Sequence, residues 1–287
     1  MACEISSERI IAARGSSDAH SVEAAAAASL PPGSLVPGLQ QANVTARDTL
    51  LAALRESLSA VAGRSRDISL IIPDATTRIM ILDFDTMPEK QEDRDAVVRF
   101  RLKKSLPFDV DQAAVSFERQ GTGTPIRVVA AVTPRSVRDE YESLVRDAGY
   151  NPGAVLPSMI AALGAVDGSK PTMVIKVERG TTSFAIVDQE QLLLYRALEN
   201  GGASVTGESL VDDVNTSLVY FEDRYGIGVD HVLVTGVESA QDLQAALNAA
   251  STNHIPVEEL VSSSMAGAAA GDVSRSALAG VVGALVS

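Results

Sequence analysis

The chain has 287 residues, 46% hydrophobic and 21% charged, which is enough apolar material for a sizeable core and excludes wholesale disorder. The formal net charge of −13 argues against bulk nucleic-acid binding, because Lys and Arg are needed to neutralise phosphates. One cysteine and three scattered histidines exclude a disulfide framework and predict no metal site. We also expect a soluble chain, since no apolar run approaches the length of a membrane span.

The first elements along the chain are predicted to be a hairpin, a helix and a buried strand. Residues 2–13 predict two strands joined by a tight turn at Ser6-Ser7, and the alanine run Ala24–Ala28 is either a short strand or a loop. Thr45 is placed to cap a helix whose leucines recur on one face. The nearly all-apolar segment Ile68–Ile72 is typical of a strand covered on both faces.

A compact segment of strands and helices comes next. Its expected elements are strand Ile79–Phe84, helix Glu92–Ser105 stopped by Pro107, strands Ala113–Glu118 and Ile126–Val132, a helix after Thr133-Pro134 and a helix over Pro157–Val166. Residues 167–170 predict a linker between two lobes.

The second half of the chain repeats the opening pattern of a hairpin followed by helices. Strands are expected at Thr172–Val177, Ser183–Val187, Leu192–Leu198 and Val232–Val234, with helices over residues 210–225, 241–249 and 278–285, and the segment 255–261 is ambiguous. Two lobes that each begin with a hairpin indicate a duplicated α/β architecture. We expect a first lobe over 1–168 and a second over 169–287, with the last helix, 274–287, packing near the lobe interface.

Several stretches then resemble one family. Val97–Asp111 has a helix that stops at a hydrophobe-Pro-Phe sequence before an acidic turn, and Ser69–Asp74 is a strand followed by Pro and Asp. Val129–Arg135 and Asp147–Pro152 match the strand, helix and turn that follow in that family. In order and spacing, over nearly the whole chain, the sequence resembles the PilM family of actin-like pilus assembly proteins.

The resemblance implies an α/β, two-lobed actin-like (ribonuclease H-like) ATPase fold, with a small α+β subdomain inserted in the first lobe at about 77–156, as in the division protein FtsA. It implies a scaffold at the inner face of the inner membrane that binds the cytoplasmic tail of a PilN-like membrane protein beside this subdomain. It further implies that the chain links this complex to the pilus motor ATPase.

The resemblance also places a nucleotide site between the lobes, formed by two hairpins that face the phosphates. In the first hairpin Glu4 stands for the family's Asp and Ser6 for its Gly, with Ser7 beside it. A side chain at Ser6 obstructs the close backbone approach that glycine permits.

In the second hairpin Lys176 replaces the family's Asp, and a cation there repels Mg²⁺. The residues that remain usable as phosphate donors are Gly180, Thr181 and Thr182, and Gly201 and Gly236 stand near the positions of two further nucleotide loops. We therefore expect a degenerate site with no catalytic residue and no bound cofactor.

Three alternatives stay open. In the first, Lys176 neutralises phosphate charge itself, and ATP binds without a metal. In the second, the chain is an active Mg-ATP-binding ATPase of the actin and sugar-kinase superfamily. In the third, it is a filament-forming actin homologue of the division type.

The basic end of the helix over 92–105 is the last feature with two interpretations. Arg101 and Lys104 belong either to a solvated face or to a docking surface for a partner's tail or anionic lipid headgroups. In the second interpretation Val98, Leu102 and Phe108 line an apolar groove beneath the charges.

Overall fold

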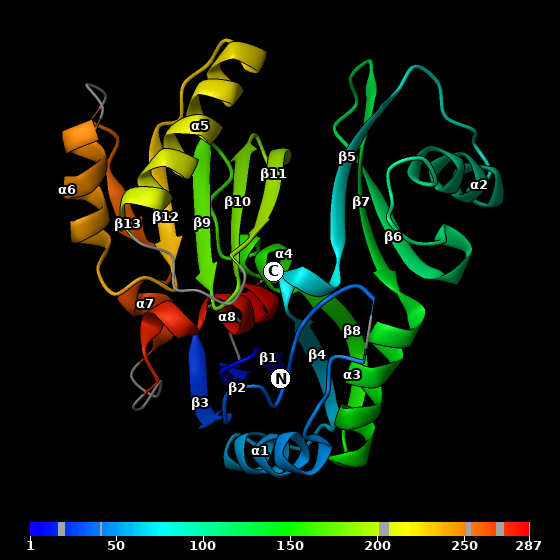
Figure 1. Cartoon of the computed structure of the whole chain (residues 1–287), viewed down its shortest axis with the longest axis vertical. Coiled ribbons are helices and arrows are strands. Elements are labelled where there is room, and N and C mark those ends of the chain that lie inside the picture. The colour runs from blue at the N-terminus through cyan, green and yellow to red at the C-terminus, as the bar shows by residue number, and fades with distance from the viewer. Residues whose placement is uncertain (17–20, 41, 201–206, 251–253, 268–272, 287) are drawn as a thin grey trace.

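Two sheets with the same strand topology form the body of the protein in the computed structural model, which describes all residues except 17–20, 41, 201–206, 251–253, 268–272 and 287 (Figure 1). The first sheet has the order β3-β2-β1-β4-β8 and the second the order β11-β10-β9-β12-β13. In each, three antiparallel strands are followed by two that run parallel to the central one. The predicted duplication is therefore present in the backbone.

The first lobe packs two helices on the outer face of its sheet. Its strands are β1 (Ala2–Ile5), β2 (Arg9–Gly15), β3 (Val22–Ser29), β4 (Asp67–Ile72) and β8 (Asn151–Pro157), and its outer helices are α1 (Arg47–Ala60) and α3 (Arg135–Asp147). Alternation along β2 sends Ile10 and Ala12 outward to these helices and Ile11 and Ala13 toward the second lobe. The alanine run is thus a strand, β3, because β2 pairs with it along its length.

The prediction that Thr45 caps α1 is wrong. The helix begins after Ala46 with no side-chain cap, while the hydroxyl of Thr45 donates to the carbonyl of Gly33. Thr45 therefore holds the preceding loop in place.

The second lobe repeats this layering with different loops. Its strands are β9 (Thr172–Glu178), β10 (Thr181–Asp188), β11 (Gln191–Glu199), β12 (His231–Thr235) and β13 (Val257–Glu259), and its helices are α5 (Gly207–Tyr225), α6 (Ala240–Ala250) and the short α7 (Ser263–Ala266). The apolar side chains of α5 and α6 that face the sheet are buried against Phe184 and Ile175. The segment 255–261, ambiguous in sequence, contributes the short edge strand β13.

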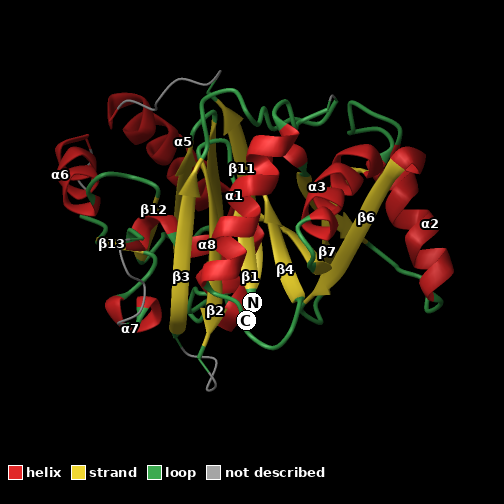
Figure 2. Cartoon of the chain, turned by 90° about the horizontal axis from the view of Figure 1, so that it is seen from below, coloured by secondary structure: helices red, strands yellow, loops and turns green. Residues whose placement is uncertain are grey.

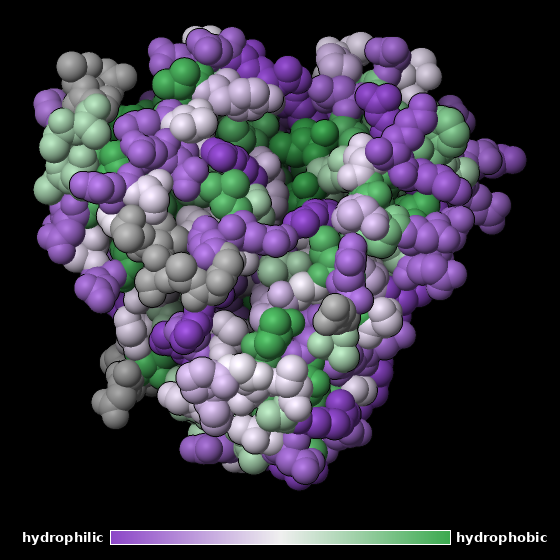
Figure 3. Space-filling view, in the orientation of Figure 1, coloured by the Kyte–Doolittle hydropathy of each residue, from purple (hydrophilic) through white to green (hydrophobic). Residues whose placement is uncertain are grey.

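A small three-stranded sheet, β5-β7-β6, projects from the first lobe between β4 and β8. It consists of β5 (Arg78–Phe84), β6 (Ala113–Gln120) and β7 (Ile126–Pro134), with α2 (Gln91–Leu102) on one face. We expected the insert to reach about residue 156, but α3 and β8 pack on the first sheet instead. The body of the insert is therefore residues 78–134. Figure 3 shows an apolar hollow between the insert and the second lobe.

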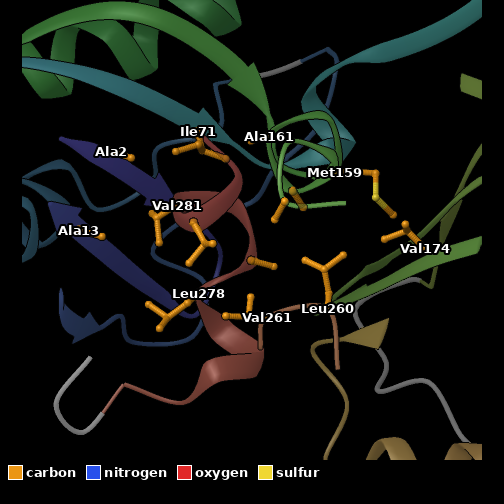
Figure 4. Close-up of a cluster of buried hydrophobic side chains, with 14 of the residues drawn as sticks. Ala2, Ala13, Ile71, Met159, Ala161, Val174, Leu260, Val261, Leu278 and Val281 are labelled. Atoms are coloured by element: carbon orange, nitrogen blue, oxygen red, sulfur yellow. The ribbon is translucent and has the colours of Figure 1, made fainter. Parts of the chain in front are cut away.

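One continuous hydrophobic core joins the two lobes at their base (Figure 4). It combines first-lobe residues such as Ile71, second-lobe residues such as Val174, and two helices, α4 (Ser158–Leu163) and α8 (Ala279–Val286). Glycine allows α8 to pack this closely on α4, since a Cβ at Gly283 would lie 1.9 Å from the carbonyl oxygen of Ala161. Each large aliphatic side chain buried here stabilises the joint by roughly 1.5–3 kcal/mol.

Short 3₁₀ turns complete the described structure at Asp74–Thr76, Val110–Gln112 and Arg275–Ala277. Within the part of the chain that the structure describes, no helix combines the length and hydrophobicity that a membrane crossing needs.

Candidate functional site: the cleft between the lobes

A cleft of about 1660 Å³ opens between the lobes above the shared core. It is lined by both hairpin turns, by first-lobe residues within 32–40 and 42–45 and by second-lobe residues between 236 and 246. It contains the hairpin residues that the sequence singled out, including Glu4, Ser6, Lys176 and Gly180. The cleft is therefore the place to test what each of them does.

The first hairpin turn closes on itself through Ser6. The Ser6 N–H donates to the Arg9 carbonyl at 3.0 Å, and the Ser6 hydroxyl donates to the same oxygen at 2.9 Å. The Arg9 N–H in turn donates to the Ser6 hydroxyl at 3.2 Å. Ser6 thus uses its N–H and its hydroxyl inside the turn, while Ser7 lines the cleft beside it.

The second hairpin turn is built around Gly180, whose φ of +88° is accessible to glycine with little strain. The carbonyl of Gly180 accepts the N–H of Asn200 at 2.8 Å. Thr182 is 1% exposed, and its hydroxyl accepts the Asn200 side-chain amide at 2.9 Å. Thr181 and Gly180 line the cleft, whereas Thr182 is committed to Asn200. Gly201, another glycine predicted to lie near the nucleotide, is outside the described residues.

Lys176 lies at the floor of the cleft, where its ammonium joins the lobes. Its Nζ is 2.7 Å from Glu178 Oε1 and 3.2 Å from Glu4 Oε1 on the opposite lobe. Lys176 is only 7% exposed and Glu4 only 4%. Burial alone would lower the pKa of Lys176, but the carboxylates of Glu178, Glu4 and Asp74 outweigh it and raise that pKa above its ordinary value. The ammonium is therefore a permanent charge between acids.

The carboxylate of Glu4 is enclosed by three other elements. Its Oε1 also accepts the hydroxyl of Ser158 at the start of α4, in addition to Lys176. Its Oε2 is buried and makes no hydrogen bond within the described residues. A Cβ added to Gly280 of α8 would lie 2.5 Å from this oxygen, so a larger residue there would displace the carboxylate. Glu4 therefore joins β1, α4, α8 and β9.

Asp74 makes a second link across the cleft floor, and sequence analysis gave it no role. It is 1% exposed; Oδ1 accepts the Met159 N–H and Oδ2 the Ser183 hydroxyl of the other lobe, both at 2.8 Å. Burial, then the nearby Glu178 carboxylate, raises the pKa of Asp74 to about 7, although Lys176 and both hydrogen bonds lower it. A charged residue directly after a buried strand and a proline was the sequence signal.

Gly236 follows β12 with a φ of +78° and supports the cleft wall. A Cβ there would lie 1.9 Å from the carbonyl oxygen of Val177, so the loop can approach β9 only as glycine. The single glycine that the sequence showed after this strand thus has a packing requirement of its own.

The charged side chains at the floor of the cleft are held by partners from more than one element. Lys176 is shared by two carboxylates, and Asp74 is held by two donors from different elements. Among the residues that the structure describes, no group of three or more His, Cys, Asp or Glu side chains is placed to bind a metal ion.

We call the apolar residues of the cleft lining that lie in the loop before α1 and in the loop after α2 the cleft arm. It consists of Leu35, Val36, Pro37 and Leu39 from the loop before α1 and Pro107 from the loop after α2. Val36 is 58% exposed and so is available for contact with a ligand. This proline-rich arm is apolar where the floor is charged.

The residues proposed to bind a partner divide into two groups. Val98 and Leu102 are fully buried between α2 and the small sheet, so the expectation that they line an open groove is wrong. Phe108 is half-buried beside the same core, while Arg101 and Lys104 are exposed. Helical periodicity shows which side chains share a face but not which face the next strands cover, which explains the error.

Comparison with known proteins finds similarity in structure but none in sequence. No protein-family model matches the chain, and no curated protein matches it at the level of sequence. A structure of the PilM-PilN type IV pilus biogenesis complex matches with a TM-score of 0.78 at 16% identity, over 99% of this chain and 97% of that one.

Two other solved structures are similar. One is the cytoplasmic domain of EpsL, an inner-membrane component of the Vibrio cholerae type II secretion system; it has a TM-score of 0.51 at 11% identity, over 92% of this chain and 98% of that one. The other is a Bacteroides thetaiotaomicron protein with an actin-like ATPase fold and unknown function. It has a TM-score of 0.55 at 11% identity, over 90% and 89%.

These similarities settle the fold. The chain has the two-lobed actin-like ATPase fold predicted from its sequence, and the expected likeness to PilM is confirmed in three dimensions.

Proposed function

We propose that this chain is a cytoplasmic scaffold of a type IV pilus or related secretion complex, peripheral to the inner membrane. The observation that carries the proposal is the match to the PilM-PilN complex over nearly the full length of both chains. The similarity to the EpsL cytoplasmic domain, from another inner-membrane machine, supports the same class of function. A pilus motor ATPase is a further expected partner.

The partner that this proposal implies is the cytoplasmic tail of a PilN-like membrane protein. The apolar cleft arm beside the insert suits such a peptide, because Val36, Pro37, Leu39 and Pro107 offer hydrophobic contacts without requiring a large area of protein surface. Burial of an exposed valine such as Val36 under a peptide would contribute about 1–2 kcal/mol to binding.

The cleft floor, in contrast, does not fit a magnesium nucleotide. The ammonium of Lys176 lies between Glu4 and Glu178, in the region where the family's two hairpins approach the phosphates. A phosphate that entered would meet both carboxylates, and Ser6 already uses its N–H within the turn. Using Lys176 as a phosphate ligand would leave two sheltered acids without their cation, which costs several kcal/mol. We therefore propose a scaffold without ATP turnover.

Titration with the N-terminal peptide of a PilN-like protein encoded nearby tests the scaffold proposal. We expect saturable binding that Val36→Glu weakens at least tenfold, because the charge would be placed in the apolar arm. Val219→Glu is the matched control, since Val219 on α5 is 59% exposed and does not line the cleft. Absence of binding, or equal loss in both variants, would contradict the proposal.

Nucleotide binding is tested separately by calorimetry with ATP, with and without Mg²⁺. We expect no Mg²⁺-dependent binding by the natural chain and no turnover. Tight Mg-ATP binding with hydrolysis would favour the enzyme alternative, and binding that resists removal of Mg²⁺ but is lost in Lys176→Met would favour the metal-free one. Concentration-dependent sedimentation would reveal the filament-forming alternative.

A further inference from the structure

The C-terminal end of α2 combines an exposed aromatic ring with several cations. Phe100 is 70% exposed, the largest fraction among the exposed large hydrophobic side chains of the described residues. The Lys104 ammonium lies 5.8 Å from the centre of its ring. Arg101 and Lys103 are also exposed, and we call Phe100, Arg101, Lys103 and Lys104 the α2 tip.

Several basic residues elsewhere in this acidic protein form ion pairs with acids. On α3, Arg138 and Arg146 both pair with Glu142. No ion pair with an acidic side chain of the described residues forms at Arg101, Lys103 or Lys104. The tip is thus a concentrated positive surface with an apolar centre, within a chain of net charge −13.

The position of the α2 tip favours contact with an extended surface. Helix α2 lies at the outer side of the insert, away from the second lobe, in both views (Figures 1 and 2). The apolar side chains beneath it, Val98 and Leu102, are fully buried, so a ligand at the tip would contact the exposed side chains of α2 and not these two. A few residues further on, Pro107 lines the cleft arm proposed for the partner's tail.

We propose that the α2 tip docks on the anionic phospholipid surface of the membrane that anchors the partner. Arginine and lysine beside a negative leaflet each strengthen binding about fivefold, and an exposed phenylalanine inserts among headgroups. The acids elsewhere on the chain oppose this weakly, because screening limits their reach to about 8 Å at physiological salt. This deepens the proposed function, since a tail leaving the membrane would enter the arm beside the docked tip.

Vesicle flotation of the full chain, without any peptide, tests the lipid contact. We expect binding to vesicles of phosphatidylglycerol and phosphatidylethanolamine that falls with added salt, and none to neutral phosphatidylcholine. Lys103→Gln with Lys104→Gln should weaken binding by about 20-fold, and Phe100→Ser by about tenfold. The matched controls are Lys90→Gln at the other end of α2 and Val219→Ser on α5.

The outcomes separate this proposal from the proposed function. Loss of vesicle binding in the tip variants alone, with unchanged affinity for the tail peptide, supports the lipid contact. Equal binding to neutral vesicles, no binding, or no difference between tip and control variants overturns it. If the tip variants instead lose peptide affinity, the tip belongs to the peptide site, and the lipid proposal fails while the scaffold proposal stands.

Discussion

The central strands of the two sheets, β1 and β9, occupy the same place in their lobes and carry opposite charges there. Glu4 lies opposite Ile71 at the last register pair between β1 and its parallel neighbour, and Lys176 lies opposite Thr235 at the corresponding pair of β9. Because both strand ends face the cleft, the acid of one lobe meets the base of the other at 3.2 Å.

The loops after β4 and β12, the parallel neighbours of β1 and β9, also carry different residues. After β4 come Pro73 and Asp74, and Asp74 reaches across to Ser183, whereas after β12 comes Gly236, which only packs on β9. Apolar alternation thus produces one fold twice, while a few polar residues decide how the two copies are joined. In this chain they join the lobes directly, through side chains.

The largest effect should come from removing Lys176, the basic partner of the pair that joins the two lobes. Lys176→Met leaves Glu4 and Glu178 sheltered without a cation, so we expect the free energy of unfolding to fall by about 3–5 kcal/mol. Denaturant unfolding at neutral pH measures it. Adding Glu4→Gln should recover part of the loss, and a Lys176→Met chain as stable as the natural one would show that the pair contributes nothing.

An intermediate, pH-dependent effect is expected at Asp74. Its folded pKa of about 7 lies above its ordinary value, so between about pH 4 and 7 the unfolded carboxyl ionises while the folded one keeps its proton. Stability from this group therefore falls as pH rises through that range. Asp74→Asn should remove the dependence and be more stable than the natural chain at pH 8.

Unfolding of both chains across this pH range measures the difference. Ser183→Ala is the control, because it removes one partner and leaves the carboxyl in place. Parallel pH profiles for Asp74→Asn and the natural chain would refute the assignment.

The smallest effect should come from a cross-lobe pair at the rim of the cleft. Charged atoms of Arg78 and Glu199 lie 3.3 Å apart, and their side chains are 35% and 65% exposed. Because water screens such a pair, Arg78→Gln should lower the free energy of unfolding by about 0.5 kcal/mol or less. The small loss should vanish at high salt, while the loss in Lys176→Met should persist. An Arg78→Gln effect as large as that of Lys176→Met would remove the distinction between floor and rim.

Much of the fold could be predicted because its signals are local. The leucines of α1 specify a helix through their period, and the short, nearly continuous apolar run of β4 indicates a strand covered on both faces. The alanine run could not be assigned, since alanine favours no face and only pairing with β2 makes it a strand. The insert boundary failed at α3 and β8, because a sequence pattern does not say which sheet a strand joins.

The cleft was harder to predict than the fold. The departures at Ser6 and Lys176 were visible in sequence, but their partners were not, since Glu4 and Lys176 belong to different lobes. Asp74 was missed because its role depends on Met159 and Ser183, which approach it only in the folded chain. The assignment of the cleft as a degenerate nucleotide site stays a prediction until the titration is done.

The helix α8 also has a consequence for synthesis of the protein. Its Leu278, Val281 and Val282 complete the core beneath Ile71 and Ile11 of the first lobe, so that core cannot close before residue 282 has left the ribosome. At about 5–20 residues per second, the nascent first lobe waits several seconds or more with an apolar face uncovered. Chaperones that hold nascent chains would be expected to act during that interval.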